Sequence, residues 1–335
     1  MPDAVLVTGA AGYVGAPLCQ ELLAAGWRVR GLDCLLHGQE YVARALERDG
    51  VELVRGDIRD PGARAEALAG AGAVVHLAAI VGDPACAREP RLAAEVNLAG
   101  SEALLADAAR AGVSRIVFAS TCSNYGRSGD PETPVDERAQ LSPVSLYAEQ
   151  KVAIERLLLP GLGSGELGDL GNLGELRSTC LRLATVYGVA PRMRFDLTVN
   201  EFTRDLWADR NLEVYGQQFW RPYVHVRDVA RAVHGVLCAE PAAVEGEVFN
   251  VGATAENYRK LDLVAAIREQ IHAGTVSYVE RHSDPRDYRV SCEKITRRLA
   301  FHTTMTVPEG IAEIAAALSA GSFPEPFDDA YRNSP

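Results

Sequence analysis

The 335-residue sequence contains no apolar run that approaches the length of a bilayer span, which is about 18–20 residues. Its N-terminus carries no basic stretch followed by an apolar core, so we expect neither a membrane-spanning helix nor a signal peptide. The cysteines are few and odd in number, and they form no CxxC pair and no Cys/His cluster. We therefore expect no metal site, no disulfide framework and a location in the reducing cytoplasm.

Positive charge is also scarce, because 34 Lys and Arg stand against 45 Asp and Glu, which leaves a net charge of −11. This charge disfavours binding to nucleic acid or to an anionic membrane. An anionic substrate would have to be held by a few local arginines against the acidic background. The length suits one large α/β domain with a smaller partner.

The first half of the chain alternates short apolar runs with amphipathic helical patterns, which predicts βαβ units and a parallel sheet. Strands are predicted at Ala4–Thr8, Arg28–Asp33, Val51–Arg55, Ala73–Leu77, Arg115–Ala119 and Ser178–Ala184. Helices are predicted at Tyr13–Ala25, Gly62–Ala69, Arg91–Ala111 and Leu146–Leu159. The expected fold class is therefore α/β, a Rossmann-type doubly wound parallel sheet.

The second half has shorter elements and longer connections, which favours a smaller C-terminal substrate-binding domain. Helices are predicted there at Leu197–Trp207, Val226–Ala239, Leu261–Ala273 and Val307–Leu318. We expect residues 1–185, rejoined by parts of 212–252, to bind a dinucleotide, and residues 186–335 to form mainly the substrate-binding domain. The six glycines between Pro160 and Glu175 predict an exposed loop, either an inserted flexible turn or a lid or partner-binding loop.

A GxxGxxG pattern at Gly9, Gly12 and Gly15 lies between the first predicted strand and the first predicted helix. Glycine allows a tight turn and a close approach of the backbone to a pyrophosphate at the helix N-terminus. Asp33, at the end of the second strand, would accept hydrogen bonds from the adenosine ribose and repel a 2′-phosphate, so NAD is favoured over NADP. Asp57, after the third strand, either meets the adenine amino group or is a turn aspartate.

Tyr147 and Lys151 are four residues apart in a predicted helix and therefore share one face. A lysine ammonium beside a phenol stabilises the phenolate and lowers its pKa from about 10, which makes a usable base. Thr121 follows the fifth predicted strand, and strand ends in such sheets face the ligand crevice. Its hydroxyl could hydrogen-bond a reacting alcohol beside Tyr147.

Together these motifs resemble those of the extended short-chain dehydrogenase/reductase family, within it the nucleotide-sugar epimerases and dehydratases. The resemblance spans essentially the whole chain and includes the Arg221–Asp228 segment. It implies catalytic residues, an NAD-binding site and a substrate-binding site. The implied cofactor-binding residues are Gly9, Gly12, Tyr13, Val14, Gly15, Asp33, Asp57, Ile58, Leu77, Ala78, Ala79, Asn97, Tyr147 and Lys151. The implied substrate-binding residues are Asp83, Thr121, Asn200, Arg221, Arg281 and Arg286, with the arginines on a UDP, dTDP or GDP diphosphate.

In this family Tyr147, with Lys151 and Thr121, would remove a proton from a sugar hydroxyl, commonly at C4, while hydride passes to the nicotinamide. Hexose 4,6-dehydratases carry Asp-Glu directly after the threonine, and the family's decarboxylases need a glutamate at the second of these positions. This sequence has Cys122 and Ser123 there, so ordinary dehydration and decarboxylation are disfavoured. Cys122 is either an acid/base or a small residue packed under the sugar.

Asp83 precedes Pro84 in a loop that usually reaches the sugar, and it is either an unconventional acid or base or a cap of that turn. The sequence thus predicts an NAD-dependent nucleotide-sugar epimerase acting at C4 through a transient keto-sugar. The alternatives are a dehydratase or 4-ketoreductase in deoxysugar tailoring and a non-catalytic NAD-sensing protein, against which the Tyr147/Lys151 pair argues. The resemblance also implies a homodimer formed through the helices at Arg91–Ala111 and Leu146–Leu159.

Overall fold

The apolar runs of the first half form most of a seven-stranded sheet with the order β10-β6-β5-β4-β1-β2-β3. The computed structural model describes residues 4–127, 130, 132–159, 176–280 and 286–333. The strands are β1 Ala4–Thr8, β2 Val29–Asp33, β3 Glu52–Arg55, β4 Ala71–His76, β5 Arg115–Thr121, β6 Arg177–Leu183 and β10 Glu247–Val251. All neighbouring pairs are parallel, so the expected Rossmann-type α/β class is confirmed.

The six strands predicted from the sequence are present, with ends that differ by at most two residues. The seventh strand, β10, pairs with β6 and comes from the range 212–252. β1 lies between β2 and β4, so the strand order reverses on either side of it. Ligands of such sheets bind in the crevice at the carboxyl ends of the strands near this reversal.

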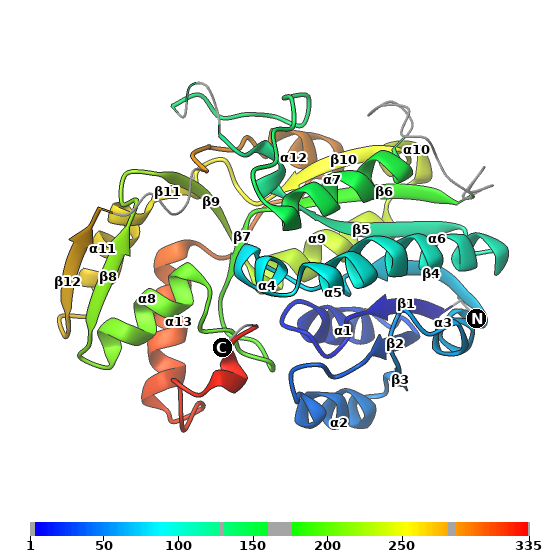
Figure 1. The fold of residues 1–335 in the computed structure, drawn as a ribbon, viewed down its shortest axis with the longest axis horizontal. Coiled ribbons are helices and arrows are strands. Elements are labelled where there is room, and N and C mark those ends of the chain that lie inside the picture. Colours follow the sequence, from blue (N-terminus) through cyan, green and yellow to red (C-terminus); the bar gives the residue numbers. More distant parts are fainter. Residues whose placement is uncertain (1–3, 128–129, 131, 160–175, 281–285, 334–335) are drawn as a thin grey trace.

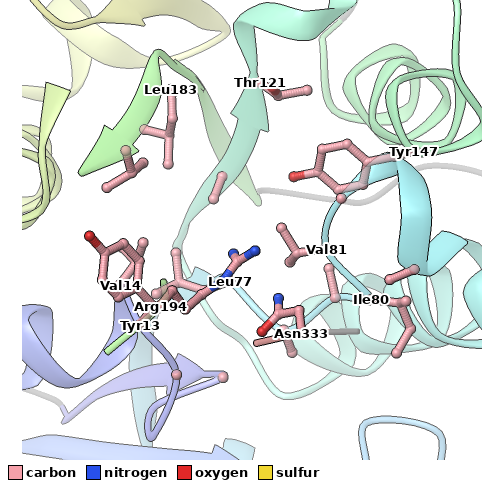
Figure 2. Close-up of a pocket in the computed structure, with 18 of the residues that line it drawn as sticks. Tyr13, Val14, Leu77, Ile80, Val81, Thr121, Tyr147, Leu183, Arg194 and Asn333 are labelled. Atoms are coloured by element: carbon pink, nitrogen blue, oxygen red, sulfur yellow. The ribbon is translucent and has the colours of Figure 1, made fainter. Parts of the chain in front are cut away.

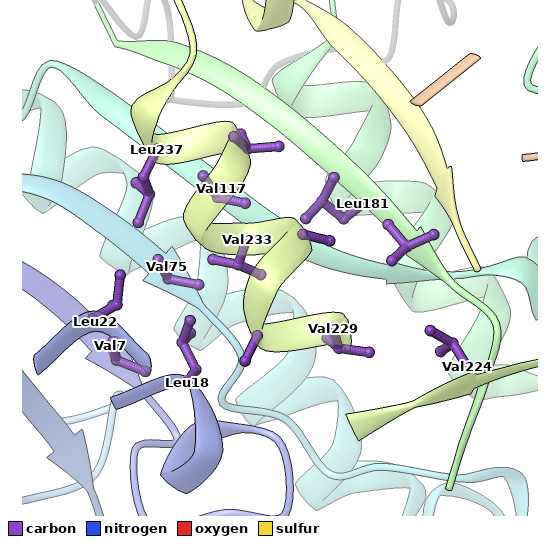
Figure 3. Packing of buried hydrophobic residues seen from close by; sticks show 14 of the residues in the cluster. Val7, Leu18, Leu22, Val75, Val117, Leu181, Val224, Val229, Val233 and Leu237 are labelled. Atoms are coloured by element: carbon purple, nitrogen blue, oxygen red, sulfur yellow. The ribbon is translucent and has the colours of Figure 1, made fainter. Parts of the chain in front are cut away.

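Helices cover both faces of the central sheet (Figure 1). On one face α1 (Gly15–Ala24) and α9 (Val226–Cys238) pack against each other and against the sheet. Figure 3 shows Val233 of α9 among Val75 and Val117 of the strands and Leu18 of α1. The opposite face is covered by α3 (Pro61–Leu68), α6 (Ser101–Arg110) and α7 (Leu146–Leu158), while α2 (Glu40–Asp49) packs beside α1. An element from the second half of the chain therefore completes the core of the first half.

The helix predicted at Arg91–Ala111 is interrupted, and this differs from the sequence prediction. It divides into α5 (Pro90–Ala94), a π-helical turn at Glu95–Gly100 and α6. Asn97 in the π turn accepts a hydrogen bond from the Ile80 N–H at 2.8 Å and donates to the Ile80 carbonyl at 3.0 Å. A π turn rotates a side chain relative to a regular helix, so the tertiary contact with Ile80 accounts for the interruption.

The smaller part of the molecule lies beside the carboxyl ends of the central strands (Figure 1). Its strands form a three-stranded sheet and a two-stranded one: β7 Thr185–Tyr187, β9 Trp220–His225 and β11 Asn257–Arg259, then β8 Asn211–Tyr215 and β12 Thr275–Val279. Its main helices are α8 Thr198–Trp207, α11 Lys260–Arg268 and α13 Val307–Ser319. Short helices elsewhere in the described residues are α4 Asp83–Arg88, α10 Pro241–Val244 and α12 Glu293–Leu299, with 3-10 helices at Cys122–Tyr125 and Asp329–Tyr331.

Two sequence expectations fall on the parts of the chain that the structure does not describe, namely the glycine-rich stretch from Pro160 to Glu175 and Arg281. All seven cysteines lie in described segments and are free thiols. Across the described ranges, no helix combines the length and the hydropathy that crossing a membrane requires.

Candidate active site

A cavity of about 500 Å³ opens at the carboxyl ends of the central strands, between the Rossmann-type sheet and the smaller part (Figure 2). It brings together most of the site residues predicted from the sequence. Those that line it are Gly9, Gly12, Tyr13, Val14, Gly15, Asp33, Asp57, Ile58, Leu77, Ala78, Ala79, Asp83, Thr121, Ser123, Tyr147, Lys151, Arg221 and Arg286. Asn97, Cys122 and Asn200 are not part of its lining.

In the turn between β1 and α1, the positions of Gly9 and Gly15 have no room for a side chain. Gly9 has a φ of +73°, and a Cβ on Gly15 would lie 2.0 Å from the Gly9 carbonyl oxygen. The N-terminus of α1 borders the cavity at Tyr13, Val14 and Gly15, and the N-cap residue, Val14, supplies no side-chain hydrogen bond. Such a helix N-terminus fits a pyrophosphate.

Asp33 closes β2 next to this turn, with its carboxylate fixed by the backbone. It accepts hydrogen bonds from the N–H groups of Ala11 at 2.9 Å and Leu35 at 2.8 Å. Burial raises the pKa of Asp33, and these two hydrogen bonds and the charge of Arg192 oppose the rise. A carboxylate in this position fits the hydroxyls of a ribose and disfavours a 2′-phosphate.

Asp57 also lines the cavity, but its carboxylate is engaged by the neighbouring Arg59. The Arg59 backbone N–H donates at 2.8 Å and its guanidinium at 2.7 Å. This contact lowers the pKa of Asp57. The contacts of Asp57 are therefore those of a turn aspartate, in a residue that also lines the cavity.

The loop after β4 is held against the glycine turn by a buried polar chain. The Thr8 hydroxyl accepts from the N–H groups of Leu77 and Ala78, both at 3.2 Å, and contacts His76 Nδ1 at 2.8 Å. Burial lowers the pKa of His76 to about 3, so the imidazole is neutral at physiological pH. Asn97 fixes the same loop through Ile80 and thus shapes the cavity wall without lining it.

Tyr147, Lys151 and Thr121 meet at the other end of the cavity. Figure 2 shows the Tyr147 hydroxyl pointing into the cavity below Thr121. Lys151 Nζ lies 5.8 Å from the centroid of the Tyr147 ring and donates to the Ala119 carbonyl at 2.7 Å. Ser145 caps α7 by accepting a hydrogen bond from the Ala148 N–H, which fixes the start of the helix that presents Tyr147.

The electrostatics of Tyr147 differ from the sequence expectation that Lys151 lowers its pKa. Burial raises the pKa of Tyr147, and the second-largest cause of the rise is the charge of a Cys86 thiolate. The positive charges of Arg194 and Arg286 lower the pKa of Tyr147. Burial also lowers the pKa of Lys151 itself to about 8. Desolvation of both groups thus outweighs the attraction inferred from their spacing.

Arg286, Asp83 and Ser123 form a cluster beside Tyr147, although they come from three distant parts of the chain. Arg286 Nη1 lies 3.0 Å from Asp83 Oδ2 and 3.1 Å from Ser123 Oγ. Asp83 opens α4, whose N-cap is Gly82, and its Oδ1 is buried with no hydrogen-bond partner among the described residues. The Asp83 carboxylate therefore pairs with Arg286 and does not cap the turn before Pro84.

Arg221 approaches the same cluster from β9. Its Nη1 donates to the Trp220 carbonyl at 2.7 Å and also to the Arg286 carbonyl, and its guanidinium lies 5.4 Å from the ring centroid of Tyr288. Tyr288, which the sequence analysis missed, lines the cavity as well. Of the three arginines expected on the substrate diphosphate, the two in described segments, Arg221 and Arg286, are therefore in contact.

Cys122 and Asn200 are placed differently from the sequence expectation. Cys122 is 1% exposed, and its thiol points away from the cavity to the Arg182 carbonyl at 3.2 Å. Burial raises the pKa of this thiol well above its usual value, which does not fit an acid/base. Asn200 is fully buried and holds the Gly188 N–H and the Tyr13 hydroxyl at 3.0 and 3.1 Å, so it supports the cavity wall.

The cavity is also lined by polar residues that the sequence analysis did not select, among them Arg192, Arg194 and Asn333. Figure 2 shows the Arg194 guanidinium and the Asn333 amide projecting into its centre. The two arginines lie one residue apart, and such a pair of cations in an acidic chain was a signal available in the sequence. Asn333 carried no signal, because it reaches the site only through tertiary packing.

Comparison with known proteins identifies the family of this chain. The NAD dependent epimerase/dehydratase family matches residues 5–252. The UDP-glucose 4-epimerase of Mycolicibacterium smegmatis is 32% identical over 317 residues, which cover 92% of this chain and 96% of the relative. The dTDP-glucose 4,6-dehydratase of Streptomyces griseus is 31% identical over 327 residues, which cover 94% of each chain.

Among solved structures, the Thermus thermophilus UDP-glucose 4-epimerase in complex with NAD aligns with a TM-score of 0.80 at 28% identity. The alignment covers 94% of this chain and 99% of that one. The family match and both relatives extend over most of the sequence, so the resemblance inferred from the motifs is confirmed. This chain belongs to the NAD dependent epimerase/dehydratase family.

Proposed function

We propose that this protein is an NAD-dependent nucleotide-sugar 4-epimerase, which oxidises a sugar at C4 and reduces the ketone from the other face. One observation carries the proposal: a single cavity holds the glycine turn and Asp33 at one end and Tyr147, Thr121 and Lys151 at the other. A dinucleotide and a sugar bound there would meet between the two groups. The relatives that are 4-epimerases share this family and nearly the full length of the chain.

The residues present fit NAD. The glycine turn lines the cavity at Gly9, Gly12 and Gly15, next to the N-terminus of α1, and such a helix N-terminus suits a pyrophosphate. Asp33 offers acceptors for ribose hydroxyls and would repel the extra phosphate of NADP. These contacts support NAD as the cofactor.

The chain's own residues supply the proton chemistry. Tyr147 accepts the proton of the C4 hydroxyl and returns it, while the Thr121 hydroxyl hydrogen-bonds the same oxygen. Lys151, anchored on the Ala119 carbonyl, contributes positive charge beneath the phenol. When bound, NAD supplies the hydride acceptor and donor, and in its oxidised form adds a positive charge that favours a phenolate.

Arg221 and Arg286 support a nucleotide-diphosphate sugar as the substrate. Both residues line the cavity of an acidic protein, with the Arg221 guanidinium on the Arg286 backbone carbonyl, and arginine binds phosphate oxygens bidentately. UDP-glucose and dTDP-glucose appear in the names of the relatives. A UDP, dTDP or GDP sugar is therefore the proposed substrate class, with neither nucleic acid nor membrane as a partner.

Dehydration is the second candidate, and one observation favours it. Asp83 lines the cavity with a buried Oδ1 that has no hydrogen-bond partner among the described residues, and its charge acts on Tyr147. Dehydratases of the family carry Asp-Glu where this chain has Cys122 and Ser123. In this second candidate the Asp83 carboxylate would act instead as the base that removes a proton from the carbon beside the ketone.

Incubation with UDP-, dTDP- and GDP-sugars in heavy water, without added cofactor, separates these candidates. A 4-epimerase converts the sugar with no solvent deuterium at carbon, whereas dehydration places deuterium on the ring or side-chain carbons. Product formation only with added NADPH would contradict both and indicate a ketoreductase. Tyr147→Phe should keep bound NAD and lose turnover; the same turnover as wild type would exclude Tyr147 as the base.

We further propose that the protein is a cytoplasmic homodimer. The free cysteines are compatible with a reducing compartment. The helices expected at the interface, α6 and α7, cover the same face of the sheet. Light scattering coupled to size-exclusion chromatography tests the subunit count, and a monomer at micromolar concentration would contradict the proposed dimer.

A further inference from the structure

The last residues that the structure describes pack onto a segment that lines the cavity. Residues 323–333, here called the C-terminal strap, contact residues 192–196, which lie between β7 and α8. The Phe195 ring meets Phe323 and Tyr331 edge to face at centroid distances of 5.2 and 5.6 Å. The Phe195 N–H donates to the Tyr331 carbonyl at 2.9 Å. The strap is therefore fixed to this segment by aromatic packing and by the backbone.

The strap also orients Arg192. Arg192 Nη1 donates to Asn333 Oδ1 at 2.7 Å and Nη2 to the Arg332 carbonyl at 3.2 Å. The Asn333 N–H donates to Asp196 Oδ2 at 3.1 Å, and Asp196 in turn holds Arg194 through two bonds of 2.9 Å. One short piece of chain thus sets the direction of two guanidinium groups in the cavity wall.

Arg192 has the features of a ligand-binding group. It is 3% exposed, yet it lines the cavity, and its Nε makes no hydrogen bond to any described residue. Burial lowers the pKa of Arg192 to about 10. A buried guanidinium N–H is costly to leave without an acceptor, so this atom marks a place for an oxygen of a ligand.

The position of Arg192 identifies which end of the cavity it serves. Its charge acts on Asp33, where it opposes the effect of burial, and on His37, whose pKa burial lowers to about 4. Both residues line the cavity beyond the end of β2. Figure 1 shows the C-terminus between the smaller part and the helices α1 and α2. Arg192 and the strap therefore border the half of the cavity that contains Asp33.

We propose that Arg192, oriented by the C-terminal strap, is a cofactor-binding residue that donates through Nε to an oxygen of the adenosine half of NAD. The strap thereby retains NAD between turnovers. The inference rests on the proposed function in one respect, the identity of NAD as the cofactor. Retention serves an epimerase because the same cofactor molecule must oxidise and then re-reduce the sugar.

The test measures release of NAD instead of turnover. Protein loaded with NAD is diluted into cofactor-free buffer, and bound NAD is followed over time by rapid filtration. Arg192→Met keeps an unbranched side chain but removes the donors, and release should accelerate about tenfold or more. Asn333→Ala removes the Oδ1 acceptor that orients Arg192, together with the amide that lines the cavity, and release should accelerate roughly threefold. Arg298→Met, on α12 and outside the cavity lining, is the matched control and should release NAD like wild type.

Wild-type release rates in both Arg192→Met and Asn333→Ala, with unchanged melting temperatures, would overturn the inference. If Arg192→Met does not fold, the release rate of Asn333→Ala decides by itself. A wild-type protein that binds no NAD at all would instead contradict the proposed function. The two failures are therefore distinguishable.

Discussion

Replacing Arg182 by Met breaks a completely buried ion pair next to β5, the strand that ends at Thr121. Arg182, on β6, contacts Glu155, on α7, with Nη2–Oε2 at 2.7 Å and Nε–Oε1 at 3.0 Å, and neither side chain is exposed. Asn124 donates to the same carboxylate at 3.0 Å, and Ser120 also bonds to it. Glu155 lies one helical turn beyond Lys151, so this pair ties α7 to the strand ends that carry Thr121.

Removing one partner of a buried ion pair costs about 3–5 kcal/mol, because the other charge is left without compensation. Asn124 and Ser120 still stabilise Glu155 in Arg182→Met, so we expect a loss near the lower end, about 3 kcal/mol. Adding Glu155→Gln removes the stranded charge, and we expect the double variant to recover about 1–2 kcal/mol of this loss.

Urea unfolding followed by circular dichroism measures these free energies. Arg138→Met is the matched control, because Arg138 also pairs with a carboxylate, Asp136, but its side chain is 90% exposed. The control should lose less than about 1 kcal/mol. A loss below about 1 kcal/mol in Arg182→Met as well, or a double variant less stable than the single one, would refute the reasoning.

Three further predictions concern the site. Burial lowers the pKa of Lys151 to about 8, so the lysine is charged below that pH and neutral above it. In a pH–rate profile, kcat should therefore fall as the pH rises through about 8. The variant Lys151→Arg should move this fall to higher pH. Gly15→Ala places a Cβ 2.0 Å from the Gly9 carbonyl oxygen. The variant should lose about 1–3 kcal/mol of unfolding free energy in urea and should copurify without NAD, as measured by absorbance. A variant that is as stable as wild type and carries NAD would contradict the packing argument. Asp33→Ser removes the charge that repels a 2′-phosphate and should narrow the preference for NAD over NADP by roughly tenfold in calorimetric titration, whereas an unchanged ratio would place the discrimination elsewhere.

The parts of the fold that sequence reasoning predicted are those with a local signal. The central strands are apolar runs bounded by turn residues, and the glycine turn carries its own sequence pattern, with Gly12 and Gly15 packed on the Gly9 carbonyl oxygen. The Tyr147/Lys151 pair is a spacing on one helix, so its placement also follows locally. What the spacing could not show was the desolvation of both groups, since burial depends on strands and loops far away in the sequence.

The elements that escaped prediction depend on distant contacts. The strands of the smaller part are short, and β7 and β11 have three residues each, too few for a periodic pattern. The π turn follows from the contact of Asn97 with Ile80. Cys122 could not be assigned a direction from the sequence, because β5 ends at Thr121 and Cys122–Tyr125 form a 3-10 helix, in which the alternation of a strand no longer holds. In the structure Thr121 and Ser123 line the cavity and Cys122 faces Arg182.

The packing of α9 and β10 on the central sheet has a consequence during translation. A nascent polypeptide that has reached residue 185 still lacks the helix that covers Val75 and Val117 (Figure 3) and the strand that pairs with β6. That face stays exposed to chaperones until residue 251 has left the ribosome. A gene fragment that stops near residue 185 would therefore encode an aggregation-prone polypeptide in place of an autonomous nucleotide-binding module.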